Sequence, residues 1–211
     1  VLQPLEAAGH WQAGDVARLH IPGSDGQPHA WREYSLASLP HEGRAEFLVR
    51  EARRPDGTPG LGSGWLCHQL KLGDTLQLQL RRNPGFHAPE PDVPLLLIGN
   101  GTGLAGLAAH LKARQQALQA GQSVGPAWLM LGERSAASDR HWDARLQAWR
   151  TQGLLQQAAQ LRHWVAQGAA IYVCGQRQGM AQSVHQALEA ALCDDTLERL
   201  ATTGRYRRDV Y

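Results

Sequence analysis

A glycine-rich turn at the end of an aliphatic run has the composition of a ligand-binding loop. The run Leu95–Ile98 stops at this turn, and an Ala- and Leu-rich stretch begins at Leu104. A buried strand, a tight turn and a helix start in this order expose backbone N–H groups and the positive end of a helix dipole, which suit a phosphate or another anion. The glycines of Gly101-x-Gly103-x-x-Gly106 allow close approach and match a dinucleotide fingerprint. An ordinary strand–turn–helix connection is the alternative.

Two candidate anion-binding motifs precede that turn. In Arg32-Glu33-Tyr34-Ser35, strand alternation places Arg32 and Tyr34 on one face and Ser35 on the other. Arginine suits a bidentate phosphate contact, tyrosine offers a ring for stacking, and serine offers a hydroxyl. The glycine-rich run Gly60–Gly64 leads into a short helix and is a second candidate anion site. Taken alone, the first motif is more simply an amphipathic strand, and the second is equally a surface loop.

A fourth motif, Ile171–Gly175, places the thiol of Cys174 at the end of a predicted parallel strand, and Met180 follows it. Open α/β sheets bind ligands at the carboxyl ends of their strands, so this thiol is a candidate site residue. A lone buried cysteine is nevertheless more often a small hydrophobic residue.

The elements that must position these motifs change character near residue 91. Before it, short alternating strands between Gly/Pro loops predict a small antiparallel barrel. After the Pro-rich stretch Ala88–Asp92, strands alternate with helices, as in a parallel α/β sheet. We therefore predict a β + α/β fold with domains at residues 1–91 and 92–211. The predicted strands are Val16–Ile21, Glu33–Ala37, Ala45–Glu51, Asp74–Arg81, Leu95–Ile98, Ala127–Leu131 and Ala170–Cys174, and the predicted helices are Leu104–Ala120, Ser138–Gln152, Gln156–Gln167 and Gly179–Leu192.

Composition narrows the range of functions. The 211 residues carry a formal net charge of +2, which indicates neither a nucleic-acid-binding surface nor an acidic tail. No apolar run approaches membrane-spanning length, and the N-terminus has no signal-peptide pattern. The 3 cysteines form no CxxC pair and favour a reducing, cytoplasmic compartment, while the 10 histidines lack the spacing of a zinc or haem site. We predict no metal site.

The order of the four motifs resembles the ferredoxin–NADP⁺ reductase superfamily, above all the reductase module of bacterial sulfite reductase flavoprotein subunits and other diflavin reductases. The resemblance covers nearly the whole chain. Asn83–Pro89 is similar to the interdomain segment of that group, and Arg205–Tyr211 is similar to its C-terminus, including the final aromatic residue. The resemblance implies an FAD-binding barrel followed by an NADP(H)-binding α/β domain.

The resemblance also implies roles for single residues. Ser35 would lie beside flavin N5, and Asp209 would help to stabilise charge during hydride transfer. Cys174 would flank the nicotinamide, and Tyr211 would cover the flavin face until the nicotinamide stacks there; these four are the expected catalytic residues. Arg32 would hold the FAD pyrophosphate. The expected cofactor-binding residues are Arg32, Tyr34, Ser35, Gly62, Ser63, Gly64 and Tyr211 for FAD, and Gly101, Thr102, Gly103, Arg134, Gly175 and Met180 for the nicotinamide dinucleotide.

Three departures from the family pattern limit these implications. Gly106 stands where the family motif Gly-Thr-Gly-x-Ala-Pro has proline, which should loosen the turn because proline pre-sets φ at a helix start. After Gln156 the chain lacks the strand, the Ser-Arg pair and the Lys-x-Tyr-x-Gln run that grip the adenosine 2′-phosphate. The chain also opens partway into the barrel, without the family's first strand, so we expect it to belong to a longer polypeptide.

The missing segment leaves the nucleotide preference open between NADPH and NADH. Either the protein has lost its grip on the 2′-phosphate, or the sequence omits a loop that the molecule contains. We favour the second, because deleting an internal parallel strand would leave a hole in the sheet. Glu133 follows the next strand, as a ribose-binding acid would, but nothing else supports that role.

The sequence therefore predicts an FAD-dependent reductase module that takes a hydride from NADPH and passes single electrons to an acceptor. The expected acceptor is a flavodoxin-like FMN domain, a haem protein or an iron–sulfur protein. The alternatives are an NADH-preferring or free-flavin reductase, and a flavin-binding electron-relay or docking module without a productive nicotinamide site. We expect no nucleic-acid partner and no membrane span in this chain, while a membrane anchor in the parent chain stays open.

Overall fold

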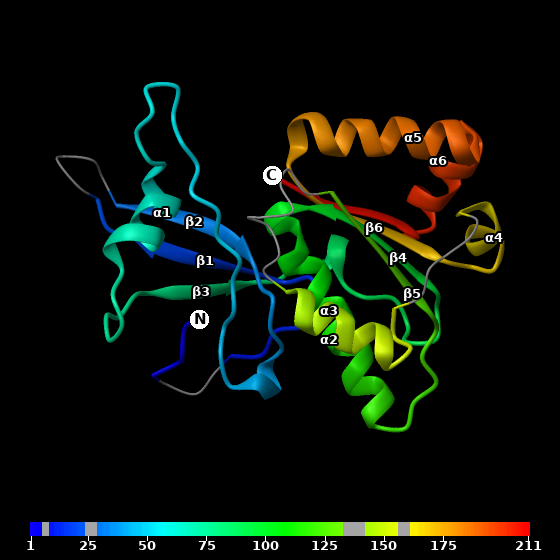
Figure 1. The fold of residues 1–211 in the computed structure, drawn as a ribbon, viewed down its shortest axis with the longest axis horizontal. Coiled ribbons are helices and arrows are strands. Elements are labelled where there is room, and N and C mark those ends of the chain that lie inside the picture. Colours follow the sequence, from blue (N-terminus) through cyan, green and yellow to red (C-terminus); the bar gives the residue numbers. More distant parts are fainter. Residues whose placement is uncertain (6–8, 24–28, 133–141, 156–160) are drawn as a thin grey trace.

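The computed structural model describes residues 1–5, 9–23, 29–132, 142–155 and 161–211. An antiparallel sheet and a parallel sheet lie one after the other along the long axis of the molecule (Figure 1). We call residues 1–91 the N-terminal half and residues 92–211 the C-terminal half. The predicted β + α/β fold is confirmed.

The N-terminal half contains an antiparallel sheet of strand order β2-β1-β3. Its central strand alternates buried Leu19 and Ile21 with half-buried His20, because successive side chains of a strand point to opposite faces. The buried set packs on Trp11 and Leu36. The elements of this half are β1 (Val16–Ile21), β2 (Ala30–Ser35), a 3₁₀ turn (Pro40–Glu42), α1 (Leu61–Gly64), a π-helical turn (Trp65–Gln69), β3 (Leu78–Arg81) and a 3₁₀ turn (Pro84–Phe86).

Over the described residues this half forms three strands where four were predicted. Strand β1 has the predicted bounds, and β2 spans Ala30–Ser35 and not the predicted Glu33–Ala37. The predicted strand Ala45–Glu51 is wrong, since only Ala45 pairs, in an isolated bridge with Leu2. Phe47 nevertheless packs against the core, so the apolar pattern reports burial without a continuous hydrogen-bond ladder. The predicted strand Asp74–Arg81 begins only at Leu78.

The C-terminal half is built on a parallel sheet of order β5-β4-β6-β7. Leu95 and Leu97 enter the core on one face of this sheet, and Leu96 and Ile98 enter the core on the other. Both faces of a parallel sheet are covered, so its strands read as continuous apolar runs. The strands are β4 (Leu95–Asn100), β5 (Ala127–Gly132), β6 (Ala170–Gly175) and β7 (Tyr206–Val210).

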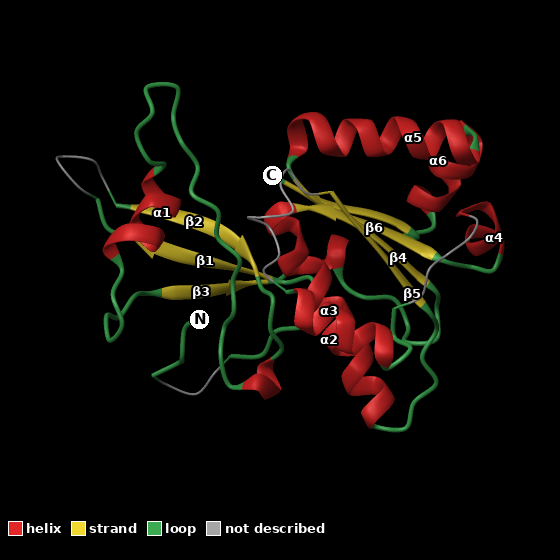
Figure 2. Ribbon diagram, viewed as in Figure 1, coloured by secondary structure: helices red, strands yellow, loops and turns green. Residues whose placement is uncertain are grey.

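Helices cover both faces of the parallel sheet (Figure 2). The first face packs on α2 (Leu104–Gln119) and α3 (Asp143–Thr151), which contribute Leu107 and Trp149 to its core. The second face packs on α4 (Leu161–Ala166), α5 (Gln182–Leu192) and α6 (Asp194–Thr202). A 3₁₀ turn at Gly101–Gly103 joins β4 to α2, and a kinked π-helical turn at Arg177–Ala181 precedes α5.

Most predicted helices of this half agree with the structure, and two elements were missed. Helix α2 ends one residue before the predicted end. Helices α3 and α4 lie within the predicted ranges, although residues 138–141 and 156–160 of those ranges lie outside the described residues. The predicted start of α5 at Gly179 is wrong, because Gly179 has a φ of +82° and interrupts the helix. Helix α6 and strand β7 were not predicted.

Strand β5 lies at one edge of the described sheet. Ala127 also forms an isolated parallel bridge with Leu155, on the side of β5 that faces away from β4. A further strand beside Leu155 would therefore extend the edge of the sheet. This geometry contradicts the expectation that losing such a strand would leave a hole inside it.

The segment Asn83–His87 connects the two halves and is bonded to both. From the N-terminal half, Asp15 accepts hydrogen bonds from Asn83 N at 2.9 Å and from His87 Nε2 at 2.6 Å. From the C-terminal half, Tyr172 Oη and Arg207 Nη1 donate to the carbonyl of His87 at 2.6 and 2.9 Å. The connection is therefore fixed at both ends.

Candidate functional site

Three predicted site residues from different strands meet at one carboxylate between the halves. Ser35 Oγ, at the end of β2, donates to Asp209 Oδ2 at 3.1 Å, and Cys174 Sγ lies 3.8 Å from the same oxygen. Cys174 and Asp209 are partners in the parallel ladder of β6 and β7. The cluster lies at the carboxyl ends of the strands, where open α/β sheets bind ligands.

Burial controls the protonation of this cluster. Burial, reinforced by the charge of Asp209, raises the pKa of the Cys174 thiol well above its ordinary value. Burial also raises the pKa of Asp209, although the hydrogen bond from Ser35 opposes this shift. The thiol is therefore uncharged near neutral pH and is not an activated nucleophile.

Both glycines of the loop Gly101–Gly103 lie close to neighbouring chain segments. A Cβ on Gly103 would overlap the backbone carbonyl of Cys174. Gly101 has a φ of +48°, and a Cβ there would lie 3.0 Å from Arg50 Nη2. The guanidinium of Arg50 thus reaches from the N-terminal half over the loop that begins α2, next to the positive end of a helix dipole.

Gly175 and Asn100 join the ends of β6 and β4. Gly175 has a φ of +142°, and a Cβ there would overlap Asn100 Oδ1 and lie 2.9 Å from Met180 Cε. The same Asn100 oxygen accepts a hydrogen bond from Gln176 N at 3.2 Å. Met180 therefore lies beside the end of β6.

The C-terminal residue Tyr211 lies across the two loops. Its backbone N–H donates to Gly175 O at 3.1 Å, and its carbonyl accepts from Arg177 N at 2.8 Å. The Tyr211 hydroxyl and Thr102 Oγ1 are 3.0 Å apart, while 58% of the residue is exposed. The pKa of the phenol is raised to about 12, chiefly because its hydroxyl end is poorly solvated.

The predicted flavin-side residues gather around Gly62. A Cβ on Gly62 would lie 2.8 Å from Arg32 Cγ and 2.9 Å from Tyr34 Oη, so only glycine fits between these side chains without a shift. Ser63 Oγ accepts a hydrogen bond from Ala52 N at 2.9 Å, which ties the loop to the neighbouring segment. Arg32, Tyr34 and the Gly62–Gly64 loop are therefore neighbours, as predicted.

Arg134 is the one predicted cofactor-binding residue that lies outside the described residues. Two further residues at the site were not predicted from the sequence, namely Arg50 and Asn100. Asn100 follows directly on the strand that leads into the glycine loop, so its position was a usable signal. Arg50 had no such signal, because the strand assigned to its segment does not form.

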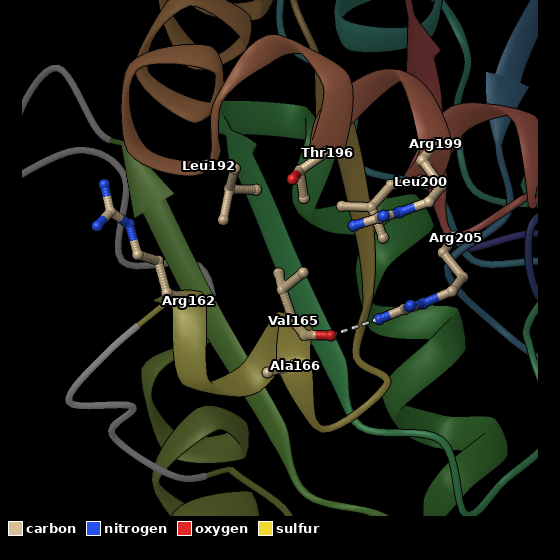
Figure 3. A pocket seen from close by; sticks show the side chains of 8 residues that line it. All are labelled: Arg162, Val165, Ala166, Leu192, Thr196, Arg199, Leu200 and Arg205. Atoms are coloured by element: carbon tan, nitrogen blue, oxygen red, sulfur yellow. Dashed lines mark hydrogen bonds between the residues drawn. The ribbon is translucent and has the colours of Figure 1, made fainter.

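A hollow of the described surface lies elsewhere, between α4, α5 and α6 (Figure 3). Its volume is about 400 Å³, and its lining includes three arginines. Arg162 Nε donates to Ala191 O at 2.6 Å, and Arg205 Nη2 donates to the carbonyls of Val165 and Ala169 at 2.8 Å. Two of the arginines thus satisfy backbone carbonyls at helix ends, and packing accounts for the hollow.

The described part of the chain contains neither a metal-binding cluster nor a membrane-spanning helix. Its His, Cys, Asp and Glu residues form no group of three or more that could hold a metal ion. None of the helices described has both the length and the apolar character needed to cross a membrane.

The fold and the carboxylate cluster between its halves define the class of protein. An antiparallel β half followed by a parallel α/β half is the ferredoxin reductase-like architecture. No family model matches the chain.

Sequence relatives give a more particular relationship. The chain is 30% identical to the sulfite reductase [NADPH] flavoprotein alpha-component of Yersinia enterocolitica and 31% identical to that of Sodalis glossinidius, in each case over 88% of this chain and 36% of the relative. The Vibrio vulnificus protein of the same name is 28% identical over 85% of this chain. The chain is therefore a homologue of these flavoprotein components and is related to the ferredoxin–NADP⁺ reductase superfamily. It spans about a third of the length of the relatives it matches.

Proposed function

We propose that this chain is an FAD-dependent reductase module that uses NADPH and supplies electrons to a separate acceptor. The observation that carries the proposal is the meeting of Ser35, Cys174 and Asp209 at one buried carboxylate between the halves. The relationship to flavoprotein components whose name includes NADPH supports the choice of cofactors. The proposed division places flavin binding in residues 1–91 and nucleotide binding in residues 92–211.

The N-terminal half fits a flavin dinucleotide. Gly62 packs closely on Arg32 and Tyr34, and its lack of a side chain brings the backbone of the loop close to the guanidinium that would hold a pyrophosphate. In this proposal Arg32 and the Gly62–Gly64 loop hold the pyrophosphate, Tyr34 stacks on the isoalloxazine, and Tyr211 covers its other face.

The C-terminal half fits a second dinucleotide. Gly101, Thr102 and Gly103 open the 16-residue helix α2, whose positive end suits a pyrophosphate. Arg50 lies over the same loop and adds a cation from the other half. In this proposal Gly175 and Met180 line the nicotinamide end, and Arg134 contacts the nucleotide.

The side chains of the cluster would position the reacting groups and exclude water. When bound, the nicotinamide supplies a hydride, and the flavin accepts it and releases the electrons singly. Ser35 directs its proton to Asp209, so its oxygen would serve as an acceptor for a flavin N–H. The uncharged Cys174 thiol supplies a small apolar wall, and Asp209 offers negative charge where positive charge develops.

The electron acceptor in this proposal is a flavodoxin-like FMN domain, a haem protein or an iron–sulfur protein.

Two alternatives make different predictions: an NADH-preferring or free-flavin reductase, and a flavin-binding relay without a productive nicotinamide site. Anaerobic titration of the FAD-loaded protein with each nucleotide separates them. We expect NADPH to bleach the flavin absorbance faster than NADH does. Faster bleaching by NADH selects the first alternative, and a flavin that neither nucleotide bleaches selects the second. A colourless protein that takes up no added FAD would refute the proposal.

The role of Tyr211 has its own test. Replacing Tyr211 with Ser removes the ring and should raise the rate with NADH relative to the rate with NADPH, because the ring no longer competes with the nicotinamide for the flavin face. Tyr211→Phe, which removes only the hydroxyl contact with Thr102, is the matched control and should keep the wild-type ratio. An unchanged ratio in Tyr211→Ser would contradict the covering role.

A further inference from the structure

A buried lysine on α2 is bonded to acids of the other half. Lys112 is 7% exposed. Its ammonium donates to both carboxylate oxygens of Glu42, at 3.0 and 2.8 Å, and to Glu46 Oε2 at 2.7 Å. We call Glu42, Glu46, Lys112, Trp142 and Arg145 the Lys112 cluster. It lies away from the Ser35–Asp209 site, on the side of α2 that faces the N-terminal half.

The Lys112 cluster contains two cations and two carboxylates. From the C-terminal half, Arg145 of α3 and Trp142, which precedes α3, also contact it. Arg145 Nη1 lies 3.5 Å from Glu46 Oε2. The Lys112 ammonium and the Arg145 guanidinium lie 5.3 and 4.4 Å from the centre of the Trp142 ring. Two cations therefore face two carboxylates in a partly desolvated place, where charge-assisted hydrogen bonds are strong but depend on every partner being present.

The acids of the cluster are held firmly by their own half. Glu42 Oε1 accepts from Leu39 N at 2.7 Å. Glu46 N donates to Ser38 Oγ at 3.0 Å, and Glu46 O accepts from Ala37 N at 2.8 Å. Although burial works in the opposite direction, the bond from Lys112 lowers the pKa of Glu46 below its ordinary value. Lys112 is therefore bound to a fixed, ionised partner.

Three residues of helix α2 that contact the N-terminal half are spaced by three. At its start, a Cβ on Gly106 would lie 3.5 Å from Ser35 Cβ. One turn on, Ala109 packs against Ala13 and Leu39. Lys112 comes one turn later. Residues at this spacing share a helix face. The first two contacts are between small apolar groups and are not directional, whereas the hydrogen bonds of Lys112 are directional and tie the helix to both acids of the N-terminal half.

We propose that Lys112 is a positioning residue that, through Glu42 and Glu46, fixes the rotation of α2 and thereby the distance between the Gly101–Gly103 loop and Ser35. The helix is continuous from Leu104 to Gln119, so a rotation at Lys112 reaches its first turn, about 12 Å away. The effect on catalysis rests on the proposed function; the effect on the orientation of α2 does not.

The chain offers a matched control on the same helix. Arg114 is also buried, and it donates to the backbone carbonyls of Gly125 and Val93, both in the C-terminal half. Lys112→Met and Arg114→Met each remove a buried charge and its hydrogen bonds from α2. Only the first removes a contact between the halves. Lys112→Arg restores a cation that can face both carboxylates.

The experiment measures hydrogen exchange in residues 101–107 of each full-length variant, and the single-turnover reduction of bound FAD at saturating NADPH. In Lys112→Met we expect faster exchange in that segment and about 10-fold slower reduction, since a small misplacement of reacting groups is costly. The dissociation constant for NADPH should change by less than about 2-fold, because the residues that would hold the nucleotide remain. Lys112→Arg should recover most of the rate, and Arg114→Met should keep both the exchange and the rate per bound FAD.

Several outcomes would overturn the inference. Equal losses in Lys112→Met and Arg114→Met would mean that only stability had been removed. Unchanged exchange in Lys112→Met would mean that the lysine does not fix the helix. If Lys112→Met fails to fold, Glu46→Gln serves in its place, because it keeps the shape of the side chain and removes its charge. We expect faster exchange in residues 101–107 and about 3-fold slower FAD reduction in this variant. A wild-type rate and wild-type exchange in Glu46→Gln would equally refute the role of Lys112. Should the protein bind no FAD, the proposed function fails, and hydrogen exchange alone still decides this inference.

Discussion

The two glycine-rich loops of this chain look alike in sequence but are used differently. Gly60–Gly64 forms the four-residue helix α1 with its N-cap and leads into a π-helical turn, and its central Gly62 faces the side chains of Arg32 and Tyr34. Gly101–Gly103 opens the 16-residue helix α2, and Gly103 is pressed against the backbone of Cys174. Side chains can shift and backbone cannot, so the first loop is adaptable and the second is rigid.

The largest expected difference between the two loops is in how much a substitution in each lowers the free energy of unfolding. Gly103 has a φ of −57°, so Gly103→Ala strains no dihedral and acts only by overlap with the Cys174 carbonyl. We expect a loss of about 3 kcal/mol of unfolding free energy, at the upper end of overpacking effects. Urea unfolding measures it. Gly85→Ala, where a Cβ would find its nearest neighbour at 4.0 Å, is the control and should be close to neutral. A loss below about 1 kcal/mol in Gly103→Ala would break the comparison.

The cysteines beside the two loops, Cys67 and Cys174, should differ almost as strongly from each other in their reactivity towards alkylating reagents. Cys67, after the first loop, is exposed, whereas Cys174, against the second, is fully buried. At about pH 8 an alkylating reagent should modify Cys174 at least about 100-fold more slowly than Cys67, because its thiol reacts only when the structure opens. Peptide mass mapping over time gives both rates. Comparable rates in the native protein would show that the second loop is mobile.

A methyl group on the first loop should impair binding more than folding. In Gly62→Ala the new Cβ displaces Arg32 and Tyr34, the residues proposed to hold FAD. We expect about 10-fold weaker FAD binding with a loss of only about 1 kcal/mol in the apoprotein. Flavin fluorescence titration measures the former and urea unfolding the latter. Unaltered FAD affinity would contradict the proposed cradle.

The smallest difference concerns the hydroxyl of each loop. Ser63 Oγ accepts from the backbone of Ala52, so Ser63→Ala leaves an amide without its partner and should cost about 1 kcal/mol. Thr102 Oγ1 bonds to the hydroxyl of Tyr211, a residue that is itself 58% exposed, so Thr102→Ala should cost less than about 0.5 kcal/mol. Thermal unfolding of both variants compares them, and the reverse order would contradict the assignment of roles.

Local pattern was enough to predict the elements that bury a regular apolar face. Val16–Ile21 and the strand from Leu95 appear where alternation and an aliphatic run predicted them. Strand β7 was missed because Arg207, Arg208 and Asp209 interrupt its apolar signal. Helix α6 does carry a sequence signal, although it was not predicted. Two aspartates lie in its first turn, and Leu197 and Leu200 follow them at helical spacing.

The site depends on contacts that local pattern does not contain. Ser35 and Asp209 are 174 positions apart, and only the resemblance to a family suggested that they belong together. Nothing in the helix sequence indicates that Lys112 is buried against Glu42 and Glu46, because a lysine on an amphipathic helix normally faces water. Arg50 was missed for the same reason. A strand was predicted at Ala45–Glu51, whereas the position of Arg50 follows from tertiary packing.

The segment Asn83–His87, which is hydrogen-bonded to both halves, has a consequence for protein engineering. A chimera that joins the N-terminal half of this chain to the C-terminal half of a relative is most naturally cut in the Pro-rich stretch after Ala88. Such a cut would keep Asp15 with its partners Asn83 and His87, but it would replace Tyr172 and Arg207, which hold the His87 carbonyl from the other side. Grafts should therefore be made between parents that share this tyrosine and arginine, or should transplant them together with the junction.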